Sequence, residues 1–377
     1  MEILYAKGKF MKIYFDDIIY SLQKAGGISK YWAKLSTNLR NVDVVHLQGK
    51  EAEKNVFYPK EKMNIINDIP LPIKIRRYLP ILHNIQCDIF HSSYYRQPLK
   101  INNDAKQVVT VHDFMYEFFD KGLKKEVHIW QKKNAMLKAD AIICVSEHTK
   151  KDLLVLYPEI NKELVYVVPN GVDDEFSIME KPIEVSIDID GITLKQDSFL
   201  LYVGNRVGCK NFEFIFNLCE SSQFIKDKGF KLVCIGGGEF SQEEKEKFRK
   251  INFQDKVYQF SNIDNLLLNK LYNYAYCLLF PSRYEGFGIP ALEAQKAGCP
   301  VVYANTSSLP EVVAYEELGF ELDNIQDAEE KLKLLENFVL KQKIVEEGVV
   351  FSSKLSWRNT ATMTAKIYNS LLEEKKI

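Results

Sequence analysis

The chain has 377 residues, of which 46% are apolar and 27% charged, and its formal net charge is −1. This length exceeds that of one ordinary compact domain and predicts two domains, and the composition argues against a disordered chain. No run of about 18 apolar residues occurs, and the first thirty residues lack the charged-then-apolar pattern of a signal peptide. We therefore expect a cytoplasmic protein that neither spans a membrane nor is secreted.

Charge is unevenly distributed along the chain. Residues 1–170 hold 26 Lys and Arg against 19 Asp and Glu (+7), so the remainder holds 24 against 32 (−8). Cations interleaved with apolar residues are typical of a surface that rests on anionic lipid headgroups, although solvated helix faces explain the pattern equally well. No nucleic-acid-binding motif accompanies the charge, and we expect no nucleic acid partner. The residues concerned are Lys74, Ile75, Arg76, Arg77, Tyr78, Lys121, Leu123, Lys124, Lys125, Trp130, Lys132 and Lys133.

Short β-rich runs alternate with stretches of helical periodicity twice along the chain, which predicts two parallel sheets built from βαβ units. The expected fold class is α/β, with two Rossmann-like, doubly wound domains facing each other across a cleft. The first series of strands is expected at Met11–Phe15, Val42–Leu47, Ile89–His91, Val108–Val111, Ala141–Val145 and Val165–Val168. The second is expected at Phe199–Val203, Lys231–Ile235, Val257–Phe260, Cys277–Phe280 and Val301–Tyr303.

A turn signal and a polar, acidic stretch that ends near Gln196 separate the two series. The boundary is expected near residue 175, with an N-terminal domain over residues 1–175, of which 1–10 are a peripheral extension. The C-terminal domain is expected over residues 176–355. An amphipathic helix is predicted within residues 356–377, and we expect it to cross back onto the N-terminal domain.

Residues 280–300 form the most informative segment, because their pattern predicts a strand end, a loop and a short helix with a clear C-terminal end. Pro290 suits the first turn of a helix, and Gly298 suits the position that follows a helix. Gly286 and Gly288 allow the backbone to approach a ligand and leave their amides near a helix N-terminus. The segment therefore predicts a phosphate cradle.

Two carboxylates flank this cradle. Glu285 is placed at the strand end, and Glu293 lies eight positions further on, within the predicted helix. Because a carboxylate accepts hydrogen bonds from vicinal hydroxyls, Glu293 suits a ribose and Glu285 suits a transferred sugar. In isolation, two such acids would be solvated helix-face charges; the glycines and prolines around them favour a ligand site.

The sequence resembles the retaining glycosyltransferases of family 4, which have the GT-B fold, and in particular mannosyltransferase-like enzymes of bacterial polysaccharide and lipopolysaccharide synthesis. In that family two Glu separated by seven residues form the donor-site signature, matched here by Glu285 and Glu293 in the local form EGFGIPALE. The resemblance extends to residues 26–31 (GGISKY), 109–113 (VTVHD), 168–172 (VPNGV), 202–206 (YVGNR) with Lys210 and Asn211, and 308–312 (SLPEV).

The resemblance implies that Arg206 and Lys210 neutralise the donor diphosphate, so that neither a metal nor a cofactor beyond the nucleotide-diphosphate sugar is expected. It implies contact of His112 with the donor sugar, where a structural histidine would otherwise be favoured. The family commonly has Arg directly after the Val-Gly pair, whereas this chain has Asn205 and then Arg206, so either can take the phosphate-contacting position. The expected catalytic residues are Glu285, His112, Arg206 and Lys210, and the expected donor-binding residues are Gly27, Asn205, Gly286, Phe287, Gly288, Ile289 and Glu293.

The implied function is that of a retaining, metal-independent hexosyltransferase that moves a sugar from a nucleotide-diphosphate sugar to a glycan or lipid-linked acceptor. Surface polysaccharide synthesis at the inner face of the cell membrane is the expected setting. Glu285 is assigned as a carboxylate that positions the sugar and stabilises charge, and a nucleophilic role is not assumed. Two alternatives remain open: a sugar-nucleotide epimerase or phosphorylase of the same fold, and a non-catalytic partner that binds nucleotide sugar.

Overall fold

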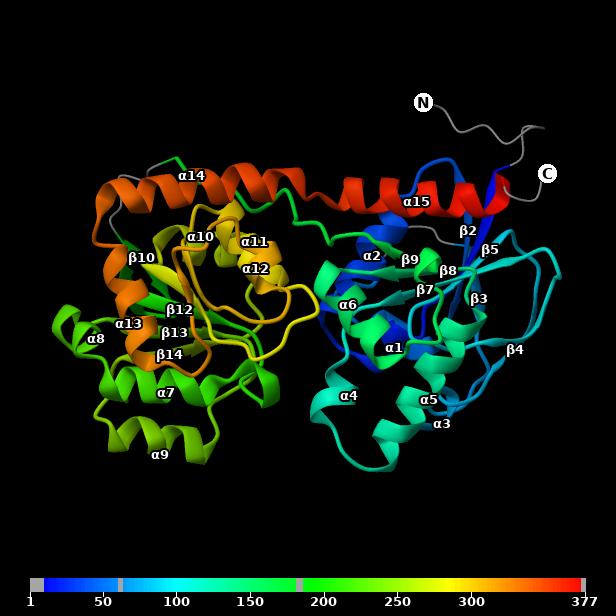
Figure 1. Cartoon of the computed structure of the whole chain (residues 1–377). Coiled ribbons are helices and arrows are strands. Elements are labelled where there is room, and N and C mark those ends of the chain that lie inside the picture. Colours follow the sequence, from blue (N-terminus) through cyan, green and yellow to red (C-terminus); the bar gives the residue numbers. More distant parts are fainter. Residues whose placement is uncertain (1–9, 60–63, 181–185, 374–377) are drawn as a thin grey trace. The chain divides into compact units, whose positions relative to one another are not determined.

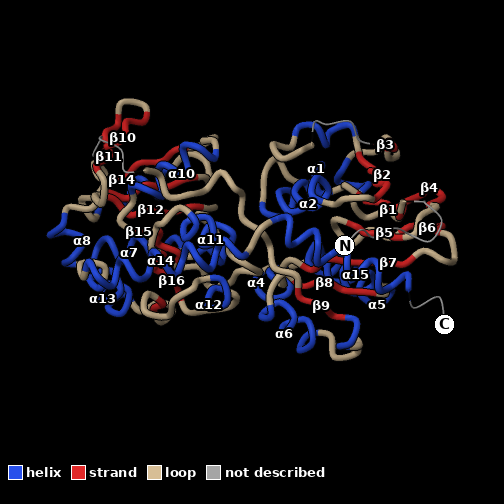
Figure 2. The backbone as a smooth tube through the Cα atoms, turned by 90° about the horizontal axis from the view of Figure 1, so that it is seen from above, coloured by secondary structure: helices blue, strands red, loops and turns tan. Residues whose placement is uncertain are grey.

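The structure is a computed structural model that describes residues 10–59, 64–180 and 186–373. The extension expected over residues 1–10 lies outside this range except for Phe10. The chain divides into two compact units, one formed by Met1–Gly171 with Trp357–Ile377 and the other by Val172–Ser356. In each unit helices surround a central parallel sheet (Figures 1 and 2). The predicted α/β class with two Rossmann-like units is confirmed.

The first unit is built on a seven-stranded parallel sheet in the order β3-β2-β1-β5-β7-β8-β9, beside which β4 and β6 form a separate pair. Strands β5 and β8 are buried along their whole length, as expected where both faces of a sheet are covered. The strands are β1 (Met11–Asp16), β2 (Val42–Gln48), β3 (Asn64–Asn67), β4 (Ile81–Ile85), β5 (Ile89–Ser92), β6 (Pro98–Ile101), β7 (Lys106–Val111), β8 (Ala141–Cys144) and β9 (Val165–Val167). The helices are α1 (Ile19–Leu22), α2 (Gly27–Asn38), α3 (Ile73–Arg76), α4 (Met115–Phe119), α5 (Leu123–Lys138), α6 (Glu147–Leu156) and α15 (Trp357–Glu373).

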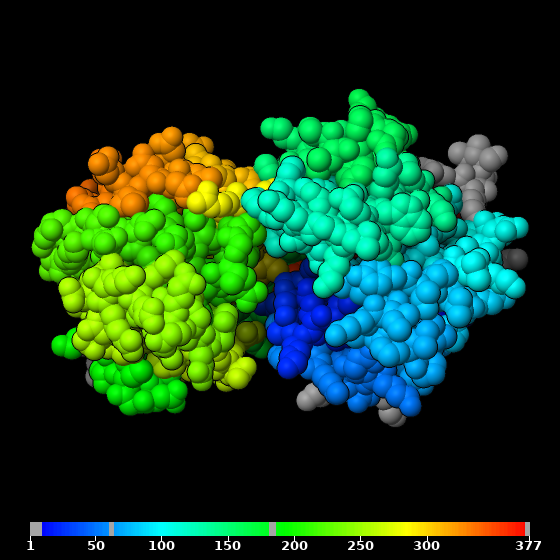
Figure 3. All heavy atoms as spheres, turned by 90° about the horizontal axis from the view of Figure 1, so that it is seen from below, coloured from blue at the N-terminus to red at the C-terminus, as the bar shows by residue number. Residues whose placement is uncertain are grey.

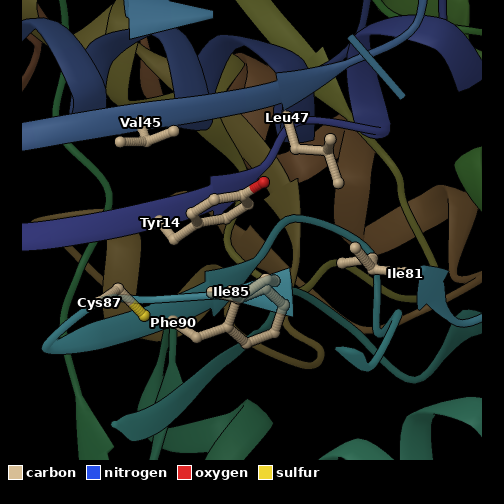
Figure 4. Close-up of a cluster of buried hydrophobic side chains, with 7 residues drawn as sticks. All are labelled: Tyr14, Val45, Leu47, Ile81, Ile85, Cys87 and Phe90. Carbon is tan, nitrogen blue, oxygen red and sulfur yellow. The ribbon is translucent and has the colours of Figure 1, made fainter. Parts of the chain in front are cut away.

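A hydrophobic cluster joins the strand pair to the main sheet of this unit (Figure 4). Tyr14 of β1 packs near Phe90 of β5, with 6.5 Å between ring centroids, and the cluster also includes Ile81 and Ile85 of β4. Burial, followed by the charges of neighbouring acids, raises the pKa of Tyr14 to about 12. Strand β4, which the sequence analysis did not predict, therefore contributes to the core of this unit.

The last helix, α15, packs against α2 in the first unit. A 2.6 Å hydrogen bond joins His91 Nδ1 on β5 to the Tyr368 hydroxyl on α15. Trp357, at the start of α15, meets Tyr31 of α2 edge to face, with 6.3 Å between ring centroids. A hydrogen bond and an aromatic contact thus fix α15 to strand β5 and helix α2.

The second unit is built on a six-stranded parallel sheet in the order β14-β13-β12-β15-β16-β17. The chain winds outward in both directions from the neighbours β12 and β15, which makes their carboxyl ends the switch point where such sheets bind ligands. The strands of the sheet are β12 (Phe199–Val203), β13 (Lys231–Ile235), β14 (Val257–Phe260), β15 (Cys277–Phe280), β16 (Val301–Ala304) and β17 (Gly319–Phe320). The second unit also contains the separate strand pair β10 (Ser186–Ile189) and β11 (Ile192–Lys195). Its helices are α7 (Phe212–Ser221), α8 (Gln223–Lys228), α9 (Gln242–Lys250), α10 (Asn265–Tyr274), α11 (Ile289–Lys296), α12 (Leu309–Val312), α13 (Ile325–Leu334) and α14 (Phe338–Lys354).

The polar stretch expected before β12 contains an antiparallel hairpin, β10–β11. Its turn residues, Asp190 and Gly191, have φ values of 52° and 80°. An Asp-Gly pair favours such a tight hairpin turn because both positions require positive φ. Part of this stretch is therefore a folded hairpin of the second unit.

Candidate functional site in the second unit

A part-buried ion pair lies at the switch point of the second sheet. Lys210 ends a short turn after β12, and Glu285 lies in the loop that joins β15 to α11. The Lys210 Nζ donates to both oxygens of Glu285, at 2.7 and 2.8 Å. The two side chains are only 25% and 9% exposed. The structure thus brings together two of the predicted catalytic residues.

Two serines that the sequence analysis did not assign to the site hold the Glu285 backbone. The Ser307 hydroxyl accepts the Glu285 N–H at 3.0 Å. The buried Ser308 hydroxyl donates to the carbonyls of Glu285 and Phe287, at 3.0 and 2.9 Å. Both serines follow β16, the neighbour of β15. Their position after an adjacent parallel strand is the signal that could have found them, because such strands end at the same edge of a sheet.

Asn211 fixes the turn that carries Lys210. It adopts a left-handed conformation, with φ of 56°. Its amide donates to the Pro281 carbonyl at 3.1 Å and to Asp323 at 3.0 Å. The Arg283 N–H also donates to the Cys209 carbonyl at 2.7 Å. These bonds tie the turn after β12 to the exit of β15 and so hold the lysine beside the carboxylate.

Helix α11 begins at this edge with Gly288 as its capping residue and Pro290 in its first turn. Gly288 has φ of 102°, and a Cβ at this position would come within 2.9 Å of the Leu309 side chain. A side chain is therefore disfavoured here by both backbone conformation and space. The helix N-terminus presents backbone N–H groups and a partial positive charge, which is suited to a phosphate. Phe287 is buried, and Ile289 is the first residue of the helix.

Glu293 lies within α11 and is 5% exposed. The Tyr272 hydroxyl on α10 donates to Glu293 Oε2 at 3.4 Å and to the Pro290 carbonyl at 3.3 Å. Burial first, and then the Glu293 charge, raises the pKa of Tyr272 well above its ordinary value. Tyr272 therefore stays protonated and is a second partner that the sequence analysis did not identify.

Arg206 has other partners than the Lys210–Glu285 pair. Its guanidinium donates to Glu244 and to backbone carbonyls of residues 236–239, and its side chain is only 3% exposed. Asn205 is exposed, and its carbonyl accepts a hydrogen bond from the Tyr202 hydroxyl. Direct contact of either residue with a diphosphate stays a prediction.

Gly27 and His112 belong to the first unit, where both follow strands at the carboxyl edge of the sheet. Gly27 begins α2, and Tyr31 of the same helix packs edge to face on His112, with 4.8 Å between ring centroids. Burial, and then the Lys132 charge, lowers the pKa of His112 to about 3, so the imidazole is neutral near pH 7. Within the described part of the chain, His112 Nε2 has no hydrogen-bond partner. The atom is buried, so its hydrogen-bonding capacity is unused among these residues.

The seven cysteines all lie within the described residues and are buried thiols. Among the residues that the structure describes, no group of three or more His, Cys, Asp or Glu side chains is placed to hold a metal ion. In the same ranges, no helix combines the length and the apolar character needed to cross a bilayer.

Two family models match most of the chain. Residues 25–176 match Glycosyltransferase Family 4, and residues 188–348 match Glycosyl transferases group 1. The chain belongs to the glycosyltransferases that these models describe. The first match covers most of the first unit's sheet, and the second covers the Lys210–Glu285 pair and α11.

Curated relatives and solved structures agree with this assignment. The chain is 25% identical over 245 residues to the serotype-specific mannosyltransferase WbdA of Escherichia coli, an alignment that covers 63% of this chain and 30% of WbdA. The chain thus spans less than a third of that relative. It is 28% identical to an uncharacterised glycosyltransferase of Methanocaldococcus jannaschii, with 96% and 99% of the two chains covered. The structure of Anabaena HepE with UDP and glucose superposes with a TM-score of 0.70 at 13% identity and covers 96% of this chain and 100% of HepE. This likeness shows the GT-B fold.

Proposed function

We propose that this glycosyltransferase moves a hexose from a nucleotide-diphosphate sugar to a glycan or lipid-linked acceptor in surface polysaccharide synthesis. The observation that carries the proposal is the part-buried Lys210–Glu285 pair at the switch point of the second sheet, next to the N-terminus of α11. WbdA is a mannosyltransferase, and HepE binds UDP and glucose; both observations support a nucleotide-sugar donor.

The reaction that fits these residues retains the anomeric configuration and needs no metal. Lys210 and the amides at the start of α11 stabilise the departing diphosphate as its bond to the anomeric carbon breaks. The Glu285 carboxylate lies beside the sugar and stabilises the positive charge that develops on the ring. The acceptor oxygen bonds to the anomeric carbon, and its proton passes to the leaving diphosphate.

Product analysis tests this reaction against an epimerase and a phosphorylase. With donor alone, we expect little turnover, whereas an epimerase interconverts the donor sugar. Added inorganic phosphate releases a sugar phosphate only from a phosphorylase. A wild-type protein that stays inactive across broad donor and acceptor panels, although it binds a nucleotide sugar, would instead be a non-catalytic partner.

Glu293→Gln is expected to weaken donor affinity by about 10- to 150-fold, because a charged hydrogen bond to the ribose is lost, worth roughly 1.5–3 kcal/mol. The measurement is the thermal stabilisation given by uridine, guanosine, adenosine and thymidine diphosphate sugars, followed by titration of the best donor. Glu330→Gln, at an exposed position of α13, is the matched control. Unchanged donor affinity in Glu293→Gln would remove its ribose role.

The basic surface expected in the first unit needs a correction, because two of its cations are buried. Arg76 is 2% exposed and pairs with Glu51 and Asp68. Lys132 is 1% exposed and pairs with Glu117. Isolated charges are rarely buried, and these two are buried because acids from other segments meet them. Neither can contact a lipid headgroup.

An exposed apolar and basic surface remains on α4 and α5, on the face seen in Figure 3. Leu123 is 79% and Trp130 64% exposed, and Phe118 and Phe119 are also exposed. The nearby side chains of Lys121 and Lys124 are exposed as well. We propose that this surface contacts anionic lipid headgroups, with the aromatic and aliphatic side chains entering the interface.

Leu123→Ser combined with Trp130→Ala is expected to lower the vesicle-bound fraction, because each apolar side chain contributes roughly 1.5–3 kcal/mol when buried. The measurement is sedimentation with anionic and neutral vesicles at low salt. Phe338→Ser, at a 76% exposed position of α14, is the control and should bind as the wild type does. Equal recovery of the wild type with anionic and neutral vesicles would contradict the proposed contact.

A further inference from the structure

The Arg206 side chain, which the reaction above does not use, is buried at the exit of β12. Its Nε donates to Glu244 Oε1 at 2.7 Å. Nη1 donates to the Gly236 carbonyl, and Nη2 donates to the carbonyls of Gly238 and Glu239, each at 2.9 Å. Its guanidinium carbon also lies 4.6 Å from the Phe240 ring centroid. Four of the five guanidinium N–H donors thus have protein acceptors.

The loop that Arg206 binds, residues 236–239, has an unusual backbone. Gly236, Gly237 and Gly238 have φ values of 87°, 71° and 72°. A Cβ at Gly237 would lie 2.8 Å from Arg206 Nη1, so the guanidinium occupies the space beneath the loop. Three successive residues in this region are accessible to glycine with little strain. The three glycines therefore allow the backbone conformation that leaves room for the Arg206 guanidinium.

The carbonyls and the amides of this loop differ in their partners. The Arg206 guanidinium donates hydrogen bonds to the carbonyls of Gly236, Gly238 and Glu239. In residues 186–373, which the structure describes without a gap, no acceptor is found for the amides of Gly237, Gly238 and Glu239. These three residues are exposed. The loop therefore presents hydrogen-bond donors to solvent, and successive backbone amides in turn conformations are an arrangement that binds anions.

The loop also lies at the ligand-binding edge of the sheet. It follows β13, the neighbour of β12, and the Gly204 amide donates to the Ile235 carbonyl at 2.9 Å. A Cβ at Gly236 would be 3.3 Å from the Gly204 carbonyl oxygen. The exits of the two strands are thus in direct contact, at the edge where doubly wound sheets bind nucleotides.

Glu244, on α9, also holds the guanidinium. One of its oxygens binds Arg206, and the other accepts the Ser241 N–H at 2.7 Å in a capping box at the start of α9. Burial raises the pKa of Glu244, but its hydrogen bonds to Arg206 and Ser241 outweigh this and bring the pKa below its ordinary value. The carboxylate therefore stays charged near pH 7 and fixes Arg206 in place.

We propose that Arg206 is a positioning residue that holds loop 236–239 with its carbonyls inward, so that the loop amides bind acceptor oxygens of the donor nucleotide. Arg206 does not itself contact the diphosphate. This inference rests on the proposed function, because it assumes a nucleotide donor. The positioning role also explains why Arg follows Asn205 in this chain. From position 206, the arginine side chain reaches the carboxyl end of the neighbouring strand β13.

The test compares Arg206→Lys, Glu244→Ala and Ser241→Ala by isothermal titration with the nucleoside diphosphate that binds the wild type best. Lysine keeps the charge but lacks the planar fork that binds several carbonyls at once. We expect Arg206→Lys and Glu244→Ala each to weaken nucleotide affinity by about tenfold, which corresponds to the loss of one or two hydrogen bonds. Donor KM should rise by a similar factor, with little change in kcat. Ser241→Ala weakens the same helix cap without touching Arg206, and it should bind as the wild type does.

The change in nucleotide affinity caused by Glu244→Ala distinguishes an Arg206 that positions the loop from an Arg206 that contacts the diphosphate. If the guanidinium contacted the diphosphate, Glu244→Ala would free it and leave nucleotide affinity equal or higher, and that result would overturn the inference. Wild-type affinity in Arg206→Lys would overturn it as well, because a simple cation would then suffice. If the wild type bound no nucleoside diphosphate at all, the proposed function itself would fail, and this outcome is distinct from the other two.

Discussion

Glu285→Gln is expected to lower kcat by about 10²–10³-fold with little change in unfolding temperature, because a fixed negative charge beside the developing oxocarbenium ion is lost. Glutamine has nearly the same shape as glutamate and can still accept a hydrogen bond from Lys210 Nζ. In the wild type this atom lies 2.7 Å from Glu285 Oε1. The side chain is 9% exposed, so water compensates little for the missing charge. Initial rates of sugar transfer, measured with the donor identified by thermal shift, check the result.

Lys210→Met should lower kcat by a similar factor of about 10²-fold, since the leaving diphosphate loses its cation. Because the two side chains contact each other, the double variant should lose much less than the product of the single losses. Lys247→Met removes an exposed ion pair with Glu213 on the same unit and is the matched control. Near-normal turnover in both Glu285→Gln and Lys210→Met would contradict the assignment of this pair to the reaction.

The strands of the second sheet could be predicted because parallel strands are buried on both faces. The runs at Phe199–Val203 and Cys277–Phe280 are nearly continuous in apolar residues, and the structure gives them these bounds. The missed strands lack this signal. Strand β3 has the sequence NIIN with mostly exposed residues, and β17 has only two residues, Gly319 and Phe320. Such strands form because the neighbouring strand offers a partner, which periodicity does not encode.

The position of the carboxylates in the site could be predicted, but their partners could not. Glu285 and Glu293 stand in a local motif whose glycines and prolines determine the backbone. The partners Ser307 and Tyr272 come from other segments, after β16 and within α10. Arg206 shows the same limit, because a cation after a strand suggests a phosphate contact until the carbonyls that it binds are known. Side-chain direction at a strand exit depends on those tertiary contacts.

Arg96→Met is expected to destabilise the first unit by about 3–5 kcal/mol, because it leaves the buried Asp16 carboxylate without its cation and Asp68 with Arg76 alone. The Arg96 side chain is 1% exposed. Its Nη1 donates to Asp68 Oδ2 at 2.6 Å, and its Nε lies 3.6 Å from Asp16 Oδ2. Arg283→Met removes an exposed pair with Asp323, about 41% and 45% exposed, and should cost less than about 1 kcal/mol. Denaturant unfolding, followed by circular dichroism, measures both variants.

The pH dependence of this loss distinguishes buried charge from lost packing. Burial raises the pKa of Asp16 from 3.8 to about 6, although the Arg96 charge opposes the rise. The folded protein therefore holds the Asp16 proton more tightly than the unfolded chain does. For such an acid, the contribution to stability is fully present below the pKa of the unfolded state. It is lost as the pH rises through the pKa of the folded state. Without Arg96, the folded-state pKa rises further and the ionised carboxylate is more costly. Arg96→Met should therefore lose more stability relative to the wild type at about pH 8 than at about pH 5. An equal loss at both pH values would mean that Arg96 stabilises the unit by packing alone.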